Sequence, residues 1–127
     1  MGFTETKTTI LVIEDDEDTR RLYRASLSAA GFAVIAVADG VDALRYIEHA
    51  RPPQAVVLDL ELPRLGGHDV YRELAAHHPT SDIPIVIVTG SDTSALDEDD
   101  FACVLRKPIL PDALVHAVEN CLRRRAR

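Results

Sequence analysis

The sequence predicts an α/β protein with a doubly wound, five-stranded parallel sheet and helices on both faces. Five short runs are apolar at every position, which is typical of strands buried on both faces: residues 10–13, 33–37, 55–58, 85–88 and 102–105. Segments with helical periodicity lie between these runs. Parallel strands need such crossover connections, so five successive strand–helix units account for the whole pattern.

Four of the five expected helices show apolar residues at helical spacing, each beside a residue that typically starts or ends a helix. The predicted apolar stripes are Leu22, Ser26, Ala29 and Ala30 before Gly31; Val41, Leu44 and Ile47 after Asp39; Val70 and Leu74 after Gly67; and Leu114, Val118, Cys121 and Leu122 after Pro111. Asp16, Glu17 and Asp18 stand where the first helix begins, and there we expect them to cap the helix and favour its dipole.

Length and composition indicate one soluble domain. We expect a single domain over residues 1–127, with a core of about 8–125 and no effector domain. A net charge of −7 argues against binding to nucleic acid or to a membrane surface. No apolar run approaches the roughly 20 residues of a transmembrane helix, and the N-terminus lacks a signal-peptide core, so we expect a cytoplasmic protein.

Three of the apolar runs end in polar side chains. Asp59 follows one run directly, the acids Glu14 and Asp15 follow another, and Thr89 follows a third. The carboxyl ends of parallel strands share one edge of a sheet, and ligand sites form at that edge. We therefore expect these side chains to meet in space.

The acids of this edge would repel one another unless something compensates their charge. Glu14, Asp15 and Asp59 would lie at neighbouring strand ends. Either one carboxyl takes up a proton or a hard divalent cation binds, and Mg²⁺ suits two or three carboxylates together with a backbone carbonyl and water.

A hydroxyl and an ammonium are predicted at the same edge. Thr89 can donate to a phosphoryl oxygen, and Gly90 after it has no side chain, which leaves space for a bulky group. Lys107 ends the last strand and is a compact point charge that suits an anionic oxygen. Together with the acids, these groups favour metal-assisted phosphoryl transfer onto a carboxylate.

Four segments, in this order, resemble a response-regulator receiver domain of two-component signalling: ILVIEDDED (10–18), AVVLDLELPRLGG (55–67), IVIVTG (85–90) and VLRKPI (104–109). The resemblance covers nearly the whole chain. It implies a flavodoxin-like fold with strand order 2-1-3-4-5 and a site between the first and third strands. It is compatible with a stand-alone receiver or with one attached to a hybrid sensor kinase.

The resemblance also implies roles for single residues. Asp59 would accept the phosphoryl group and ligate the metal, with Glu14 and Asp15 as further ligands and Glu61 as donor of a backbone carbonyl. The cofactor would be Mg²⁺, with Mn²⁺ as a substitute. The phosphoryl donor would be a phosphohistidine on a sensor histidine kinase or a histidine phosphotransfer protein, and a homodimer is compatible with the family.

The remaining implied roles concern the switch. Thr89 would supply the switch hydroxyl and Lys107 a salt bridge to the phosphoryl group, and the Lys107–Pro108 peptide is commonly cis in the family. Glu61 and Ser91 stand at the positions that tune hydrolysis of the phosphoryl group. Gly90, which leaves space beside the switch hydroxyl, belongs to the same modulating set.

Two departures from the family concern its output. Val104 stands where an aromatic switch residue is usual. Thr89 and Lys107 are 18 residues apart, roughly one helical turn less than the family norm, and the acidic segment 91–100 lies between them, so we expect the fourth helix to be short or irregular. We therefore expect output through ordering of that segment, or through the loop 64–67, instead of an aromatic flip.

Other functions fit the sequence less well. A pseudo-receiver that binds partners without phosphorylation is the main alternative, and the complete acceptor site argues against it. A Mg²⁺ phosphohydrolase of the haloacid dehalogenase kind needs an Asp where Glu61 stands. A flavodoxin would need a phosphate loop rich in Ser and Thr.

Overall fold

The structure is a computed structural model, and it describes residues 7–62, 66–76, 82–90 and 103–125. The elements along the chain are β1 (Thr9–Ile13), α1 (Glu17–Ala29), β2 (Ala33–Val37), α2 (Gly40–His49), β3 (Ala55–Asp59), α3 (Gly67–Ala76), β4 (Ile85–Thr89), β5 (Cys103–Arg106) and α4 (Pro111–Arg125). None of the described helices is long and apolar enough to span a membrane.

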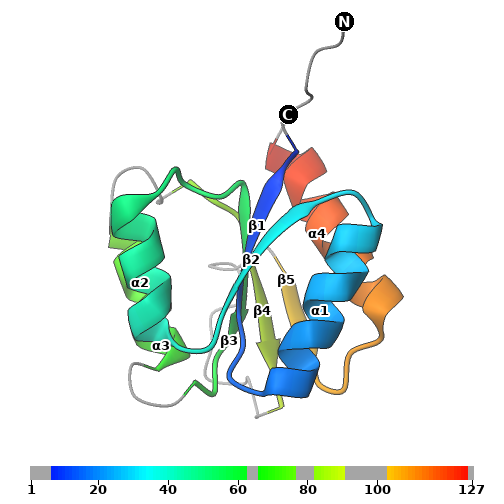
Figure 1. Cartoon of the computed structure of the whole chain (residues 1–127), viewed down its shortest axis with the longest axis horizontal. Helices are drawn as coiled ribbons and strands as arrows, with labels where there is room; N and C mark the ends of the chain where they lie inside the picture. The colour runs from blue at the N-terminus through cyan, green and yellow to red at the C-terminus, as the bar shows by residue number, and fades with distance from the viewer. Residues whose placement is uncertain (1–6, 63–65, 77–81, 91–102, 126–127) are drawn as a thin grey trace, which may run out of the picture.

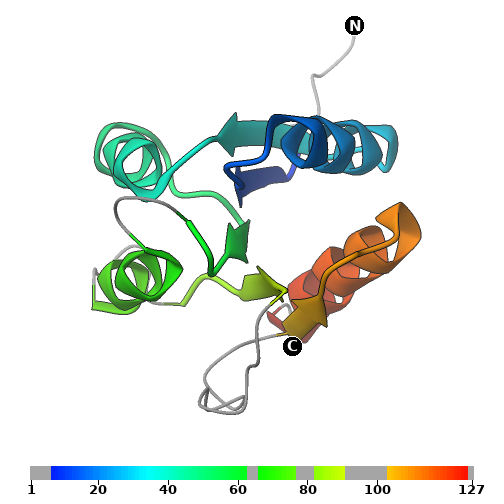
Figure 2. The same cartoon turned by 90° about the horizontal axis from the view of Figure 1, so that it is seen from below.

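All five strands are parallel and lie in the order β2-β1-β3-β4-β5. Helices α1 and α4 cover one face of the sheet, while α2 and α3 cover the other (Figures 1 and 2). The predicted fold class, strand order and placement of helices on both faces are therefore confirmed. Segment 91–100, through which we expect output, lies outside the described residues.

Alternation along the strands explains why the apolar runs have no polar positions. Ile10 and Val12 of β1 point into the layer under α1 and α4, whereas Leu11 and Ile13 point into the layer under α2 and α3. All four side chains are fully buried. A strand in the middle of this sheet needs an apolar residue at every position because both of its faces are covered.

The predicted apolar face of α1 was wrong by one residue. The expected stripe consisted of Leu22, Ser26, Ala29 and Ala30. The structure instead buries Tyr23 and Leu27, and Leu22 is 46% exposed. Two long side chains four residues apart cover more of the sheet than a stripe made largely of Ser and Ala, so burial of Tyr23 and Leu27 decides the rotation of the helix.

The helix starts agree with the predicted caps. The Asp16 carboxylate accepts a hydrogen bond from Thr19 N at 2.9 Å, and the Asp39 carboxylate accepts one from Asp42 N at 2.9 Å. Helix α4 begins at Pro111, a position that tolerates the missing N–H. These caps fix the points at which the chain leaves the sheet edge and turns back over its faces.

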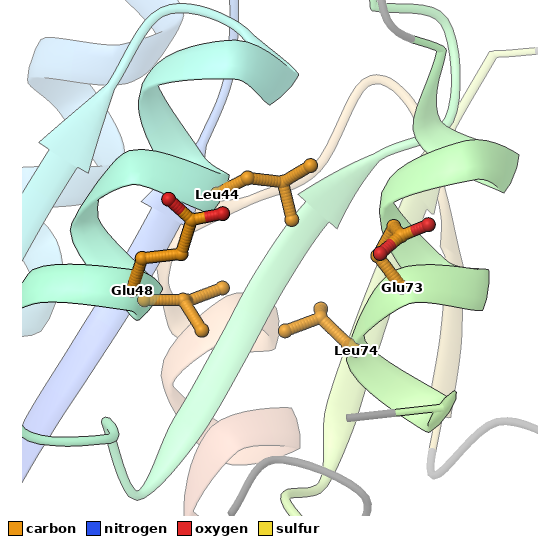
Figure 3. A pocket seen from close by; sticks show the side chains of 5 residues that line it. Leu44, Glu48, Glu73 and Leu74 are labelled. Carbon is orange, nitrogen blue, oxygen red and sulfur yellow. The ribbon is translucent and has the colours of Figure 1, made fainter. Parts of the chain in front are cut away.

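A small hollow lies between the two helices on one face of the sheet. Figure 3 shows Leu44 and Glu48 of α2 facing Glu73 and Leu74 of α3 across it. Its volume of about 40 Å³ is far below that of pockets for small organic ligands. The floor is apolar, and the two carboxylates give the rim a negative charge.

Candidate functional site

The site lies at the carboxyl ends of the central strands. Asp59 is the last residue of β3 and Thr89 the last residue of β4, while Glu14 follows β1 and Lys107 follows β5. Strand register pairs Ile13 with Leu58, which brings the next residues along, Glu14 and Asp59, to the same edge. The structure thus brings the predicted residues together.

Three carboxylates form a compact cluster at this edge. One oxygen from each of Glu14, Asp15 and Asp59 lies within 4.8 Å of the other two. The side chains of Glu14 and Asp59 are buried, whereas Asp15 is exposed. An arrangement of hard oxygen ligands open to solvent on one side suits a divalent cation.

Lys107 compensates part of this negative charge. Its Nζ lies 2.8 Å from Glu14 Oε1 and 3.2 Å from Asp59 Oδ2. The contact with Asp59 is also a hydrogen bond, but Glu14 Oε1 has no well-aligned donor among the described residues. The Lys107–Pro108 peptide bond is cis, as the family resemblance implied.

Burial and charge shift the pKa values of this pair. Burial raises the pKa of Glu14 to about 7, although Lys107 and the Asp16 N–H stabilise its charged form. Partial burial acts to lower the pKa of Lys107, but the Glu14 and Asp59 carboxylates outweigh it and raise that pKa above its ordinary value. The lysine therefore stays a cation, whereas burial disfavours the charged form of Glu14.

The loop between β1 and α1 is fixed by its own hydrogen bonds. Arg20 Nη1 donates to the carbonyl oxygens of Glu14 and Asp15 at 3.1 and 3.3 Å, and Asp16 N donates to Glu14 Oε2 at 3.2 Å. Asp16 caps α1, as predicted, and its pKa is lowered by the hydrogen bond from the Thr19 hydroxyl. The role of Arg20 was not predicted, because nothing local marks an arginine that bonds to carbonyls five and six residues before it.

Glu61 has contacts that the sequence did not predict. Its backbone N–H donates to Asp59 Oδ1 at 2.9 Å. Its side chain crosses to the end of β4, where Oε1 accepts hydrogen bonds from Thr89 Oγ1 at 3.0 Å and from Gly90 N at 2.7 Å. The residue thus touches both the central carboxylate and the predicted switch hydroxyl.

The other predicted modulating positions have different outcomes. Val104 of β5 is half-buried and packs against the apolar cluster on the α2 and α3 face. Ser91, the acidic segment 91–100 and most of the loop 64–67 lie outside the described residues, so the predicted output through these segments stays a prediction. The predicted roles of the site residues are likewise taken up as proposals below.

Gly67 allows the start of α3 to lie close to the end of β3. A Cβ atom at this position would lie 2.4 Å from Leu60 Cα and 2.6 Å from Asp59 O. Both neighbours are backbone atoms, which cannot rotate away. The start of α3 therefore rests directly on the backbone that carries Asp59.

We expect Gly67→Ala to lower the free energy of unfolding by about 2 kcal/mol, because the methyl group forces α3 away from β3. Urea unfolding checks this value. Gly66→Ala is the matched control, since its Cβ would meet no atom closer than Asp69 Oδ2 at 3.7 Å. Equal unfolding midpoints for the two variants would contradict the close approach at Gly67.

Fold and site together define an α/β domain with an acidic cluster at its carboxyl edge, and the family model of the response regulator receiver domain matches residues 10–119. The chain belongs to this family. The match begins at the second residue of β1, includes the other four strands in full and covers most of α4.

Relatives with similar sequences support the same assignment. Response regulator MprA of Mycobacterium sp. (strain KMS) is 39% identical over 122 residues, which cover 91% of this chain and 50% of the relative. Probable transcriptional regulator ycf27 of Porphyridium aerugineum is 38% identical over 125 residues, with coverage of 93% and 49%. Among solved structures, a sensor protein from Polaromonas sp. JS666 superimposes with a TM-score of 0.85 at 27% identity, covering 94% of this chain and 99% of that chain.

The chain spans about half the length of the curated relatives it matches. One of these relatives is named as a transcriptional regulator. The relatives therefore do not support the expectation that nucleic acid is not a partner. That expectation rested on the net charge of −7, which describes only this chain and not the half of each relative that lies outside the match.

Proposed function

We propose that Asp59 accepts a phosphoryl group from a phosphohistidine of a sensor histidine kinase or histidine phosphotransfer protein in the cytoplasm, and that a downstream protein reads the modified domain. The position of Asp59 carries this proposal. Its buried carboxylate ends the central strand, with Oδ1 held by the Glu61 N–H and Oδ2 by the Lys107 ammonium. A carboxylate fixed in this way is an oriented nucleophile at the edge where ligands of α/β sheets bind.

The transfer needs little from the protein besides positioning and charge. An oxygen of Asp59 forms a bond to phosphorus while the P–N bond of the phosphohistidine breaks and its electron pair returns to the imidazole. Lys107 would remain beside the new acyl phosphate as its counter-charge, and the Thr89 hydroxyl would donate to a phosphoryl oxygen. Attack of water on phosphorus later releases phosphate and restores the Asp59 carboxylate.

The residues present fit a divalent cation. Glu14 Oε1 is buried, and among the described residues its contact is the Lys107 ammonium at 2.8 Å, which is not aligned as a hydrogen bond. One ammonium beside three carboxylates leaves negative charge that a cation would compensate. Glu14, Asp15 and Asp59 would hold Mg²⁺, or Mn²⁺, with the carbonyl of Glu61 as a further ligand. A bound cation would neutralise negative charge on Asp59 and on the phosphoryl oxygens.

The partner must reach the carboxyl edge of the sheet. A hollow of about 380 Å³ lies beside Lys107 and is lined also by Leu22 and Tyr23 of α1 and by Pro108 and Ile109. Leu22 is partly exposed, so this approach has an apolar rim. We propose that a donor protein contacts this hollow when its phosphohistidine approaches Asp59.

The proposal is tested by incubating the protein with acetyl phosphate and Mg²⁺ and measuring its intact mass. We expect a gain of one phosphoryl group per chain, which is lost when a chelator replaces Mg²⁺. An unchanged mass under both conditions would remove the phosphoacceptor function and leave a phosphorylation-independent interaction module as the function of the domain.

Removal of Asp15 is expected to have opposite effects with and without metal. Asp15→Asn relieves repulsion in the cluster, so without Mg²⁺ the variant should be as stable as the wild type or more stable. With Mg²⁺ at about ten times the wild-type Kd, the wild type should gain about 1.4 kcal/mol and become the more stable protein. Thermal melts of both proteins check the reversal, and Asp18→Asn, an exposed acid outside the cluster, is the control.

A further inference from the structure

The Glu61 side chain links the loop after β3 to the end of β4. Two donors converge on a single oxygen, since Thr89 Oγ1 lies 3.0 Å and Gly90 N 2.7 Å from Glu61 Oε1. The side chain reaches these donors from an exposed position beside the Asp59 carboxylate. A surface glutamate thus fills a small anion-binding corner between the two strand ends.

The same corner is where a phosphoryl group on Asp59 would need donors. Asp59 pairs with Val88 in the strand register, and Thr89 and Gly90 follow directly. A hydroxyl and an amide each have one hydrogen to donate, so neither can fully serve Glu61 and a phosphoryl oxygen together. The negative charge of Glu61 would also oppose a dianionic group beside it.

We propose that the Glu61 carboxylate is an internal anion that occupies the Thr89 and Gly90 donors at rest and is displaced when Asp59 is phosphorylated. This inference rests on the proposed function. It makes Glu61 a positioning residue that holds the resting state and slows the entry of the phosphoryl group.

The displacement also provides a route for output. Val104 is half-buried and has a short, branched side chain with one rotatable χ angle, so it cannot swing as a large ring does. A displaced Glu61 carboxylate would instead carry a negative charge from the Thr89–Gly90 corner into solvent. A partner could then distinguish the two states by the position of this charge.

Amide exchange at Gly90 tests the resting contact. Without metal or phosphodonor, we expect the Gly90 amide to exchange about tenfold faster in Glu61→Ala than in the wild type, because its acceptor is gone. Glu61→Gln keeps an acceptor oxygen and should retain most of the protection. Glu73→Ala removes an exposed acid from α3 and is the matched control for charge. Equal exchange in Glu61→Ala and the wild type would overturn the inference.

The labelling rate with acetyl phosphate and Mg²⁺ tests the displacement. We expect Glu61→Ala to be labelled about tenfold faster than the wild type and Glu73→Ala, with Glu61→Gln between them. Labelling of all four proteins at one rate would overturn the inference and leave the proposed function intact. Absence of labelling in every protein would overturn both, and labelling of the Glu61 variants alone would support the inference strongly.

Discussion

Asp59→Asn is expected to take up no phosphoryl group from acetyl phosphate and Mg²⁺. The amide has nearly the shape of the carboxylate but is a poor nucleophile, so the reaction should fail while the fold persists. The amide oxygen of the variant can still accept the hydrogen bond from the Glu61 N–H, and Lys107 keeps its contact with Glu14. Intact mass shows the loss of labelling, and circular dichroism shows the retained fold.

A matched control separates the acceptor from acids elsewhere on the surface. Asp112→Asn makes the same chemical change at an exposed position in the first turn of α4, and it should be labelled at the wild-type rate. If Asp59→Asn were labelled to the same extent as Asp112→Asn, the acceptor would have to be another residue.

Lys107→Met is expected to lower the free energy of unfolding by about 3 kcal/mol in the absence of metal. The substitution keeps the length of the side chain but removes the ammonium from between the buried carboxylates of Glu14 and Asp59. Loss of one partner from a buried charge pair leaves an uncompensated charge in a poorly solvated place. Urea unfolding in the presence of a chelator measures the effect.

The matched control for this variant removes the cation from a solvent-exposed ion pair of similar length. Arg21 Nη2 lies 2.8 Å from Glu17 Oε1, but both side chains are well exposed. Arg21→Met should therefore cost about 0.5 kcal/mol or less. Glu14→Gln combined with Lys107→Met should recover part of the lost stability, because it removes one buried charge. A loss at Lys107 no larger than that at Arg21 would contradict the compensating role of the lysine.

The sheet, and the meeting of several predicted side chains at its carboxyl edge, could be predicted because each depends on local sequence. A run such as 55–58 is apolar on both faces, and the residue that ends it must lie at the shared edge. The choice between Leu22 and Tyr23 for the buried face of α1 could not be made in this way. That choice depends on which side chain fills the space under the helix, and only the packed structure defines this space.

The contacts of Glu61 and Arg20 were equally inaccessible from sequence. The Glu61 carboxylate meets Gly90 because two strands lie in a particular register and one side chain adopts a particular rotamer. Arg20 reaches back over a helix start to carbonyl groups that belong to no sequence motif. Long polar side chains at a loop have many possible partners, so their residue type alone does not select one.

The hydrogen bonds of Arg20 and Asp16 have a thermodynamic consequence for the acidic loop. They restrain the backbone from Glu14 to Asp16 while the chain folds, before any ion arrives. The conformational entropy lost in shaping that loop is therefore a cost of folding and not of cation capture. An ion that entered such a preformed cradle would give up its own water and would share the Glu14 and Asp59 carboxylates with the Lys107 ammonium, but the loop itself would need little rearrangement.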